Sequence, residues 1–309
     1  MTDWALAVDI GGTKLAAARV RRDGTVQVRA QRPTPENGDA ETVWDALAGL
    51  LADVVADDRP DLVGVGCGGP MRWPAGEVSP LNLHAWRDFP LRARLGQCYP
   101  GARVRVHNDA VAMTAGEHWR GAGRGTRNFL GMVVSTGVGG GVVCDGRLAN
   151  GSSGNAGHIG HVVVDADGPA CMCGGHGCLE AVARGPAVVA WAVAQGWTGN
   201  ADGPALVDAA RAGDPICLAA LTRAGRAIGV AVASVAAVLD LDAAAVGGGL
   251  ANAGDLLLGP ATAAFERHAG LDFVRRCRLV PAELGADAGL VGAAALVFDE
   301  ASYWPAGAD

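Results

Sequence analysis

The sequence is short of positive charge. It has 25 basic residues against 32 acidic ones, a formal net charge of −7, and Lys14 is its single lysine. Proteins that bind nucleic acids or anionic membranes usually carry a basic field. The composition argues against both classes, so we expect neither a nucleic-acid nor a membrane partner.

The N-terminus lacks the features of a secretory signal. No basic segment precedes an apolar run there, and Asp3 and Asp9 interrupt it. The longest apolar run, residues 227–239, is too short to span a bilayer and is interpreted as a buried helix. We therefore expect a cytoplasmic protein.

Aromatic side chains make up only 5% of the chain, but 50% of it is apolar. A chain of 309 residues with this composition can bury a sizeable core, and its length suggests two domains. The 47 glycines occur in short clusters between apolar runs. Such clusters indicate tight loops at ligand sites rather than disorder.

Two segments share a pattern of strand, glycine loop and strand. Strands over 4–10 and 15–20 flank the first loop, and strands over 129–135 and 141–144 flank the second. This repetition predicts two related α/β domains that face a cleft. Helical spacing of apolar residues predicts helices over 40–57, 109–119, 179–195, 204–212, 214–239 and 289–298.

The first glycine loop is suited to phosphate. It lies between two strands rather than before a helix, so it is neither a Walker loop nor a dinucleotide fingerprint. Gly11 and Gly12 let the backbone approach an anion, while Thr13 adds a hydroxyl and Lys14 a positive charge. Asp9, at the strand end, could hold Mg²⁺ directly or through water. The alternative is an ordinary hairpin with a polar tip.

Two later glycine loops extend this interpretation. Thr136, Gly137 and Gly139 belong to the matching second loop, which we expect to run as a turn to Gly141. The two loops together would clamp the phosphates of a nucleotide. Residues 247–249 are all glycine and follow a predicted buried strand, so Gly248 and Gly249 could admit an adenosine against the backbone.

His107-Asn108-Asp109 lies at a predicted strand-to-helix junction. A carboxylate there can accept the proton of a substrate hydroxyl that attacks phosphorus, and Asn108 can bind a neighbouring hydroxyl. The alternative is that Asp109 only caps the following helix.

Three of the eight cysteines are clustered. Cys171, Cys173 and Cys178 together with His161 supply four ligands suited to tetrahedral Zn²⁺, which would make the site closed and structural. His158 and His176 are competing candidates for the fourth ligand. Glu180 follows the cluster and could bind sugar hydroxyls; alternatively, it is a first-turn carboxylate that favours the helix dipole.

These segments together resemble the ROK family (repressors, open reading frames and kinases). The resemblance covers the chain from Asp9 to about Ala295. The matching segments are residues 9–14 (DIGGTK), 108–110 (NDA), 135–140 (STGVGG), 154–161 (GNAGHIGH) and 171–180 (CMCGGHGCLE).

The resemblance implies an α/β protein with the two-lobed actin-like ATPase fold, related to ribonuclease H, with a cleft between the lobes. The small N-terminal domain would span residues 1–115, joined by a C-terminal helix at about 290–309. The large domain would span 116–289 and contain a zinc loop at 161–178. Homodimers are common in the family, so a homodimer is expected.

The resemblance also implies Mg-ATP-dependent phosphorylation of a primary hydroxyl on a hexose-like substrate. Asp109 would be the base, Asn108 would bind the sugar, and His161 would both complete the zinc site and bind hydroxyls with Glu180. Gly68 and Gly69 would approach the sugar by backbone, and Asn82 falls in a substrate-side loop.

One position departs from the family pattern. Glucose-type members have a glutamate where this chain has His158, and that glutamate binds ring hydroxyls. The family also contains N-acetylmannosamine kinases and kinases of C7-cyclitols, so these substrates are alternatives to glucose.

Two other function classes are weighed against a kinase. Repressors of the family carry a helix-turn-helix domain before the first glycine loop, but only eight residues precede Asp9 here. A sugar sensor without catalysis is disfavoured because the Asn108-Asp109 pair and the phosphate loops are retained. We therefore expect a kinase.

Overall fold

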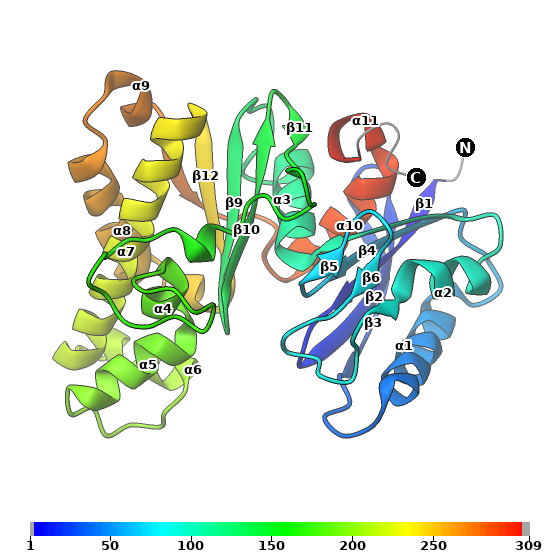
Figure 1. Ribbon diagram of the computed structural model, residues 1–309, viewed down its shortest axis with the longest axis horizontal. Helices are drawn as coiled ribbons and strands as arrows, with labels where there is room; N and C mark the ends of the chain where they lie inside the picture. Colours follow the sequence, from blue (N-terminus) through cyan, green and yellow to red (C-terminus); the bar gives the residue numbers. More distant parts are fainter. Residues whose placement is uncertain (1–2, 305–309) are drawn as a thin grey trace. The chain divides into compact units, whose positions relative to one another are not determined.

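The first sheet has the strand order β3-β2-β1-β4-β8 in the computed structural model, which describes residues 3–304 (Figure 1). β1 is antiparallel to β2 and parallel to β4, which is in turn parallel to β8. The strands predicted over 4–10 and 15–20 are confirmed as β1 and β2, with a shift of one residue at each end of β2. The five strands are β1 (Trp4–Ile10), β2 (Lys14–Arg21), β3 (Val26–Pro33), β4 (Leu62–Cys67) and β8 (Arg103–Asn108).

Large apolar side chains cover one face of this sheet. Leu6, Val8 and Ile10 alternate along β1 and pack with Val43 and Leu47 of helix α1 (Ala40–Val55). Alternation places the intervening residues of the strand on the opposite face. Asp9 therefore lies on the face that α1 does not cover.

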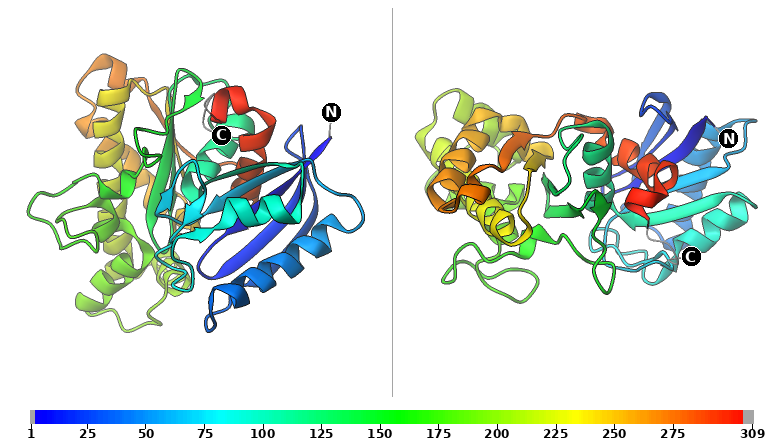
Figure 2. Two further views of the ribbon diagram at one scale, coloured as in Figure 1. Left: turned by 45° about the vertical axis from the view of Figure 1, so that its right-hand side comes forward. Right: turned by 90° about the horizontal axis from the view of Figure 1, so that it is seen from above.

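That opposite face is lined with alanine and glycine, so two helices approach it closely. They are α3 (Asp109–Arg120) and α10 (Ala288–Phe298), and Figure 2 shows them from two further sides. Where the helices cross, a Cβ atom on Gly292 would overlap the carbonyl group of Ala112. Only glycine allows this backbone contact between α3 and α10.

The second sheet has the order β11-β10-β9-β12-β13, and β12 is parallel to both β9 and β13. The prediction of a turn as far as Gly141 is wrong, because β10 already begins at Val138. A Cβ on Gly141 would lie 2.9 Å from Thr114 of α3, so this glycine serves close packing. The strands are β9 (Phe129–Val134), β10 (Val138–Cys144), β11 (Arg147–Leu148), β12 (Ala243–Gly247) and β13 (Arg278–Pro281).

Six helices accompany this sheet, and one of the predicted helices is divided. The expected helix over 179–195 is interrupted at Arg184, which is extended with ψ 145°. Pro186 cannot donate an N–H within a continuous helix, but it suits the first turn of a new one. The helices are α4 (Leu179–Ala183), α5 (Gly185–Ala194), α6 (Gly203–Arg211), α7 (Pro215–Leu239), α8 (Asp255–His268) and α9 (Asp272–Arg275).

The helix predicted over 214–239 is confirmed as α7, and the apolar run over 227–239 forms its C-terminal half. The 25 residues of α7 are enough to cross a membrane by length and composition alone, unlike the run over 227–239. However, 61% of its most apolar 18-residue stretch is buried. It packs along α8 and against α4 and α5, as a core helix does.

The sequence analysis did not predict several small elements. A three-stranded sheet is formed by β5 (Met71–Arg72), β6 (Glu77–Val78) and β7 (Phe89–Pro90), and helix α2 (Leu91–Cys98) follows it. Helix α11 (Glu300–Tyr303) comes after α10.

Contacts divide the chain into two units. The first unit runs to Gly125, includes Gly141–Gly157 and resumes at Glu283, and the second comprises Thr126–Gly140 and His158–Ala282. Our expected domains were instead divided after residue 115 and near residue 290. Residues 305–309 of the expected C-terminal segment lie outside the described residues.

Candidate active site

The carboxyl ends of β1, β4 and β8 bring two acidic residues together. Parallel pairing aligns Asp9 with Gly66, and Gly66 with His107. Asp109 comes two residues after His107 and begins α3. Its negative charge acts on Asp9, so these two predicted site residues share one edge of the sheet.

Asp9 has a perturbed acidity. Burial, and then the charge of Asp109, raise the pKa of Asp9 to about 6, against the opposing effect of Lys14 and Arg29. The carboxylate also lies at the start of α10, where a Cβ on Gly289 would be 2.8 Å from Asp9 Oδ2. An acid in this environment favours a cation that offsets the paired negative charge.

Asn108 caps helix α3. Its Oδ1 accepts hydrogen bonds from the backbone N–H groups of Ala110 (3.0 Å) and Val111 (3.3 Å). Asp109 Oδ1 also accepts from Ala110 N–H, at 2.8 Å. Asn108 is the N-cap residue of the helix, and its amide nitrogen is the group that could bind a ligand.

The first glycine loop is held by a residue that the sequence analysis missed. Thr34 is 4% exposed and follows β3. Its N–H donates to the carbonyl of Thr13 (3.0 Å), and its Oγ1 donates to the carbonyl of Gly11 (2.8 Å). Gly11 N–H closes the loop on the Lys14 carbonyl at 2.9 Å. No local pattern marks Thr34, because its partners come from a strand pairing.

The loop that carries Asn82 packs on this glycine loop. A Cβ on Gly12 would lie 2.5 Å from the Asn82 carbonyl oxygen. Gly69 is also tied to the loop, because its carbonyl accepts from Leu81 N–H at 3.0 Å. The structure therefore brings Gly12, Gly69 and Asn82 into one region of the first unit.

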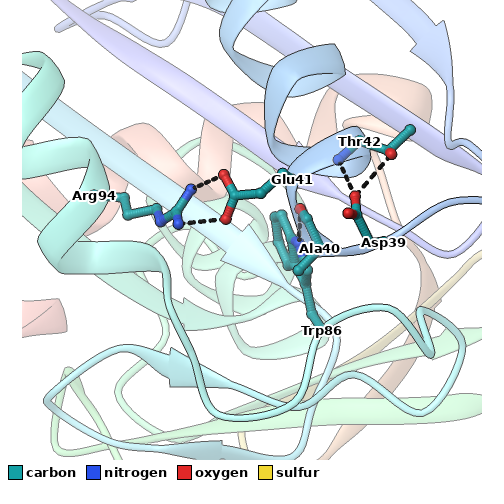
Figure 3. A network of polar contacts seen from close by, with 6 residues as sticks. All are labelled: Asp39, Ala40, Glu41, Thr42, Trp86 and Arg94. Atoms are coloured by element: carbon teal, nitrogen blue, oxygen red, sulfur yellow. Dashed lines mark hydrogen bonds and ion pairs between the residues drawn. The ribbon is translucent and has the colours of Figure 1, made fainter.

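Trp86 anchors the Asn82 loop to α1 (Figure 3). This side chain is fully buried, and its Nε1 donates to the carbonyl of Ala40 at 3.1 Å. Nearby, Asp39 caps α1 through Thr42, and both oxygens of Glu41 accept from Arg94. The start of α1 is thereby a fixed support for the loop.

His107 is a buried neutral imidazole directly before Asn108. Its Nδ1 accepts from the Asn108 N–H at 2.8 Å, so its Nε2 carries the proton and donates to Asn150 Oδ1 at 2.7 Å. Burial lowers the pKa of His107 to about 4, against the opposing effect of the Asn150 bond. The loop after β11 thus supports the strand end that carries Asn108.

His107 and Asp9 are expected to oppose each other in the pH dependence of stability. Between pH 4 and 6.5 the unfolded state binds more protons at His107, so the unfolding free energy rises with pH by about 3 kcal/mol. Between pH 3.8 and 6 the folded state binds more protons at Asp9, so the unfolding free energy falls by about 3 kcal/mol.

Single variants should reveal the two contributions. From pH 4 to pH 6.5, the unfolding free energy of Asp9→Asn minus that of the wild type should increase by about 3 kcal/mol. For His107→Gln, the same difference should decrease by about 3 kcal/mol. Urea unfolding without added Mg²⁺ measures both, and subtracting the wild-type curve cancels the other carboxylates. Parallel curves for Asp9→Asn and wild type would contradict the assignment.

In the second unit, two glycine loops lie at neighbouring strand ends. Parallel pairing aligns Gly247 of β12 with Val133 of β9. The loop at Thr136 and Gly137 follows β9, and Gly248, with φ +93°, follows β12 against Val134. Gly249 continues into a 3₁₀ turn, whereas Gly139 lies within β10 rather than in the loop.

Glu180 is joined to the second glycine loop. Its Oε2 accepts from the Val138 N–H at 2.9 Å. Glu180 is half-buried in the first turn of α4, one residue after the helix begins. The carboxylate thus connects α4 to the second glycine loop through a hydrogen bond. The alternative, in which Glu180 only interacts with the helix dipole, does not account for this bond.

The candidate metal site brings together the four side chains expected from sequence. The ligand atoms of His161, Cys171, Cys173 and Cys178 all lie within 4.8 Å of one another, without His158 or His176. Cys173 and Cys178 sulfurs are 3.7 Å apart, and Cys171 Sγ is 3.9 Å from His161 Nδ1. Tetrahedral Zn²⁺ with Zn–S of about 2.3 Å places its sulfurs about 3.8 Å apart, so the residues fit this ion.

His158 lies beside this cluster. Its exposed ring stacks on that of His161, with centroids 6.2 Å apart and planes at 25°. In the second unit, His158 lies beside His161, and Glu180 lies in the helix that follows Cys178. In the first unit, Asp9 lies near Asp109, and Asn82 packs on the glycine loop at Gly12.

Comparison with known proteins identifies the family. The ROK family model matches residues 5–300. The chain is 34% identical to a glucokinase of Thermotoga maritima, covering 94% of this chain and 96% of the relative. It is 36% identical to an N-acetylmannosamine kinase of Haemophilus influenzae, covering 95% of each.

A solved structure agrees with this. The crystal structure of a ROK family glucokinase from Streptomyces griseus, in complex with glucose and AMPPNP, is 33% identical. It superimposes with a TM-score of 0.82 over 95% of this chain and 99% of that one. The expected actin-like ATPase fold is confirmed, and the chain belongs to the ROK family.

Proposed function

We propose that this protein is an ATP-dependent kinase that phosphorylates the primary hydroxyl of a hexose-like substrate. The observation that carries the proposal is Asp109 at the carboxyl edge of the first sheet, paired with Asp9. The relatives named glucokinase and N-acetylmannosamine kinase support the same reaction class.

Asp109 would act as the general base. Its carboxylate would take the proton of the substrate hydroxyl while the hydroxyl oxygen bonds to the γ-phosphorus of ATP. The bond between that phosphorus and the β,γ-bridging oxygen breaks, and ADP leaves. Asn108 would offer its amide N–H to a neighbouring hydroxyl, because its Oδ1 is engaged at the helix cap.

The glycine loops would hold ATP. Backbone N–H groups around Gly12 and Gly137 can donate to phosphate oxygens, Gly11 closes the loop through its bond to the Lys14 carbonyl, and Lys14 adds positive charge. Gly248 and Gly249 would leave room for the adenosine. A bound Mg²⁺ would offset the phosphate charge, and Asp9 has the oxygen ligands that this ion prefers.

The metal loop would support substrate binding rather than catalysis. Zn²⁺ held by three thiolates and His161 has no open position, so it would be structural. It would order the loop between His158 and Glu180, and these two side chains would reach sugar hydroxyls. Gly68, Gly69 and Asn82 would contribute to the same substrate from the first unit's loops.

An assay of ADP release against a panel of substrates tests this function. The panel contains hexoses, N-acetylhexosamines, inositols and cyclitols, each with Mg-ATP. We expect ADP release that depends on the presence of one or more polyols with a six-membered ring and a primary hydroxyl. The absence of sugar-dependent ADP release across the panel would contradict the proposal.

His158 favours a substrate other than glucose. A carboxylate only accepts hydrogen bonds, whereas a neutral imidazole offers one donor and one acceptor. Losing one charge-assisted bond costs about 1.5–3 kcal/mol, roughly ten- to hundredfold in kcat/KM. A related N-acetylated sugar or cyclitol should therefore be a better substrate than glucose.

His158→Glu should shift this preference. We expect kcat/KM for glucose to rise about tenfold and that for the preferred substrate to fall. His268→Glu introduces the same charge at an exposed position of α8 and should change neither value. The idea fails if the wild type already prefers glucose and His158→Glu lowers its kcat/KM.

A further inference from the structure

Helix α3 contains a buried carboxylate that the proposed reaction does not use. Glu117 has no exposed surface. Three backbone N–H groups donate to it: Leu284 to Oε1 at 2.8 Å, and Ala122 and Glu283 to Oε2 at 2.9 and 3.1 Å. A buried carboxylate offsets its desolvation only through such bonds, so all three belong to a built arrangement.

These donors come from two segments that are far apart in the sequence. Ala122 lies shortly before the chain leaves the first unit after Gly125, and Glu283 is the residue at which it returns. The backbone carbonyl of Glu117 also accepts from Gly121 and Gly123, at 3.0 and 2.9 Å. One residue thus fastens the outgoing and the returning segment to the end of α3.

The returning segment leads directly to Asp9. Leu284 is followed by a 3₁₀ turn and then by α10, whose Gly289 lies against the Asp9 carboxylate. Beside Glu117, the backbone of Gly116 meets α10 at Gly292, where a Cβ would be 2.7 Å from the Gly292 nitrogen. The position of α10 along α3 therefore depends on contacts at and beside Glu117.

We propose that Glu117 is a positioning residue for the two acids of the site. Its carboxylate fixes the start of α10 relative to α3. Asp9 lies beside α10 and Asp109 begins α3, so the same contact sets the distance between the two acids. The inference rests on the proposed function, in which Asp9 binds Mg-ATP and Asp109 is the general base.

Gly121 is part of the same arrangement. A Cβ there would overlap Glu117 Oε2, so glycine leaves the space that the carboxylate occupies. Gly121→Ala therefore displaces the carboxylate without removing it. It gives a second, independent way to disturb the bonds to Ala122 and Glu283.

Glu117→Gln is the first test, because glutamine has the same shape but its NH₂ group opposes at least one of the donors. We expect faster amide hydrogen exchange at Ala122, Glu283 and Leu284, and in the segment around Gly289. With Mg-ATP, kcat/KM should fall about 10- to 100-fold while far-UV circular dichroism is retained. Gly121→Ala should reproduce both changes.

Asp242→Asn is the matched control. Asp242 Oδ2 likewise accepts two backbone N–H groups, from Arg127 and Asn128 at 2.8 and 2.9 Å, but in the second unit. Exchange at those two amides should rise, with kcat/KM for Mg-ATP within about twofold of the wild type.

The outcomes separate the inference from the proposed function. Exchange that rises at Glu283 and Leu284 but not around Gly289, or a Glu117→Gln variant with wild-type kcat/KM, would overturn the positioning role. If Glu117→Gln does not fold, the same two readouts on Gly121→Ala decide. A wild type without sugar-dependent turnover would refute the proposed function alone, because the exchange around Gly289 still tests how α10 is held.

Discussion

Asp109→Asn should lower kcat by about 10²–10⁴-fold, which is the usual loss when a positioned base is removed. The substitution keeps the size of the side chain and an oxygen that can accept from Ala110 N–H, as Asp109 Oδ1 does at 2.8 Å. Asn108 still caps α3, so the helix should begin at the same residue. The KM for the sugar should change little, because only proton transfer is lost. Steady-state kinetics with the best substrate of the panel measures both constants.

Asp45→Asn is the control for this experiment. Asp45 is an exposed residue of α1, and its substitution should leave kcat unchanged. An Asp109→Asn variant with more than half of the wild-type kcat would show that another group accepts the proton.

Zinc removal is expected to have the second large effect. Freshly purified protein should contain one Zn²⁺ per chain, and Cys173→Ser should lose it, because three ligands hold the ion much less tightly than four. Activity should then fall at least about tenfold although zinc takes no part in the chemistry. The reason is local: the loop that follows His161 ends at Cys178, immediately before the helix that carries Glu180.

Elemental analysis and the ADP-release assay test this together. Cys98→Ser changes an exposed cysteine of the first unit and should keep both the zinc and the activity. Folded, active wild-type protein without zinc would rule out the assignment.

Local patterns account for the parts of the site that lie within short segments. The strand–glycine–strand spacing predicted β1 and β2 around Gly11 and Gly12, and the cysteine spacing predicted that Cys171, Cys173 and Cys178 lie together. These features depend on neighbours in sequence, so periodicity and spacing are sufficient to recognise them.

The pairing of Asp9 with Asp109 has a different origin. It depends on the order β1-β4-β8, which no segment of the sequence specifies by itself. Thr34 and Glu117 were missed for the same reason, because their partners are backbone groups brought close by the fold. The helix break at Arg184 was missed although Pro186 marks it, because the apolar spacing continues across the break.

The first unit is completed only by a segment that follows the second unit in the sequence. Helix α10, which covers β1 and β4, begins at Ala288, after the whole second unit has been encoded. The chain is synthesised from its N-terminus at about 5–20 residues per second, so β1 and β4 are made long before α10. Until then, their alanine- and glycine-rich face is without the helix that covers it in the finished protein. The segment that encodes α10 therefore decides whether the first strands reach their folded state, and a premature stop before Glu283 would remove the helix that lies against Asp9.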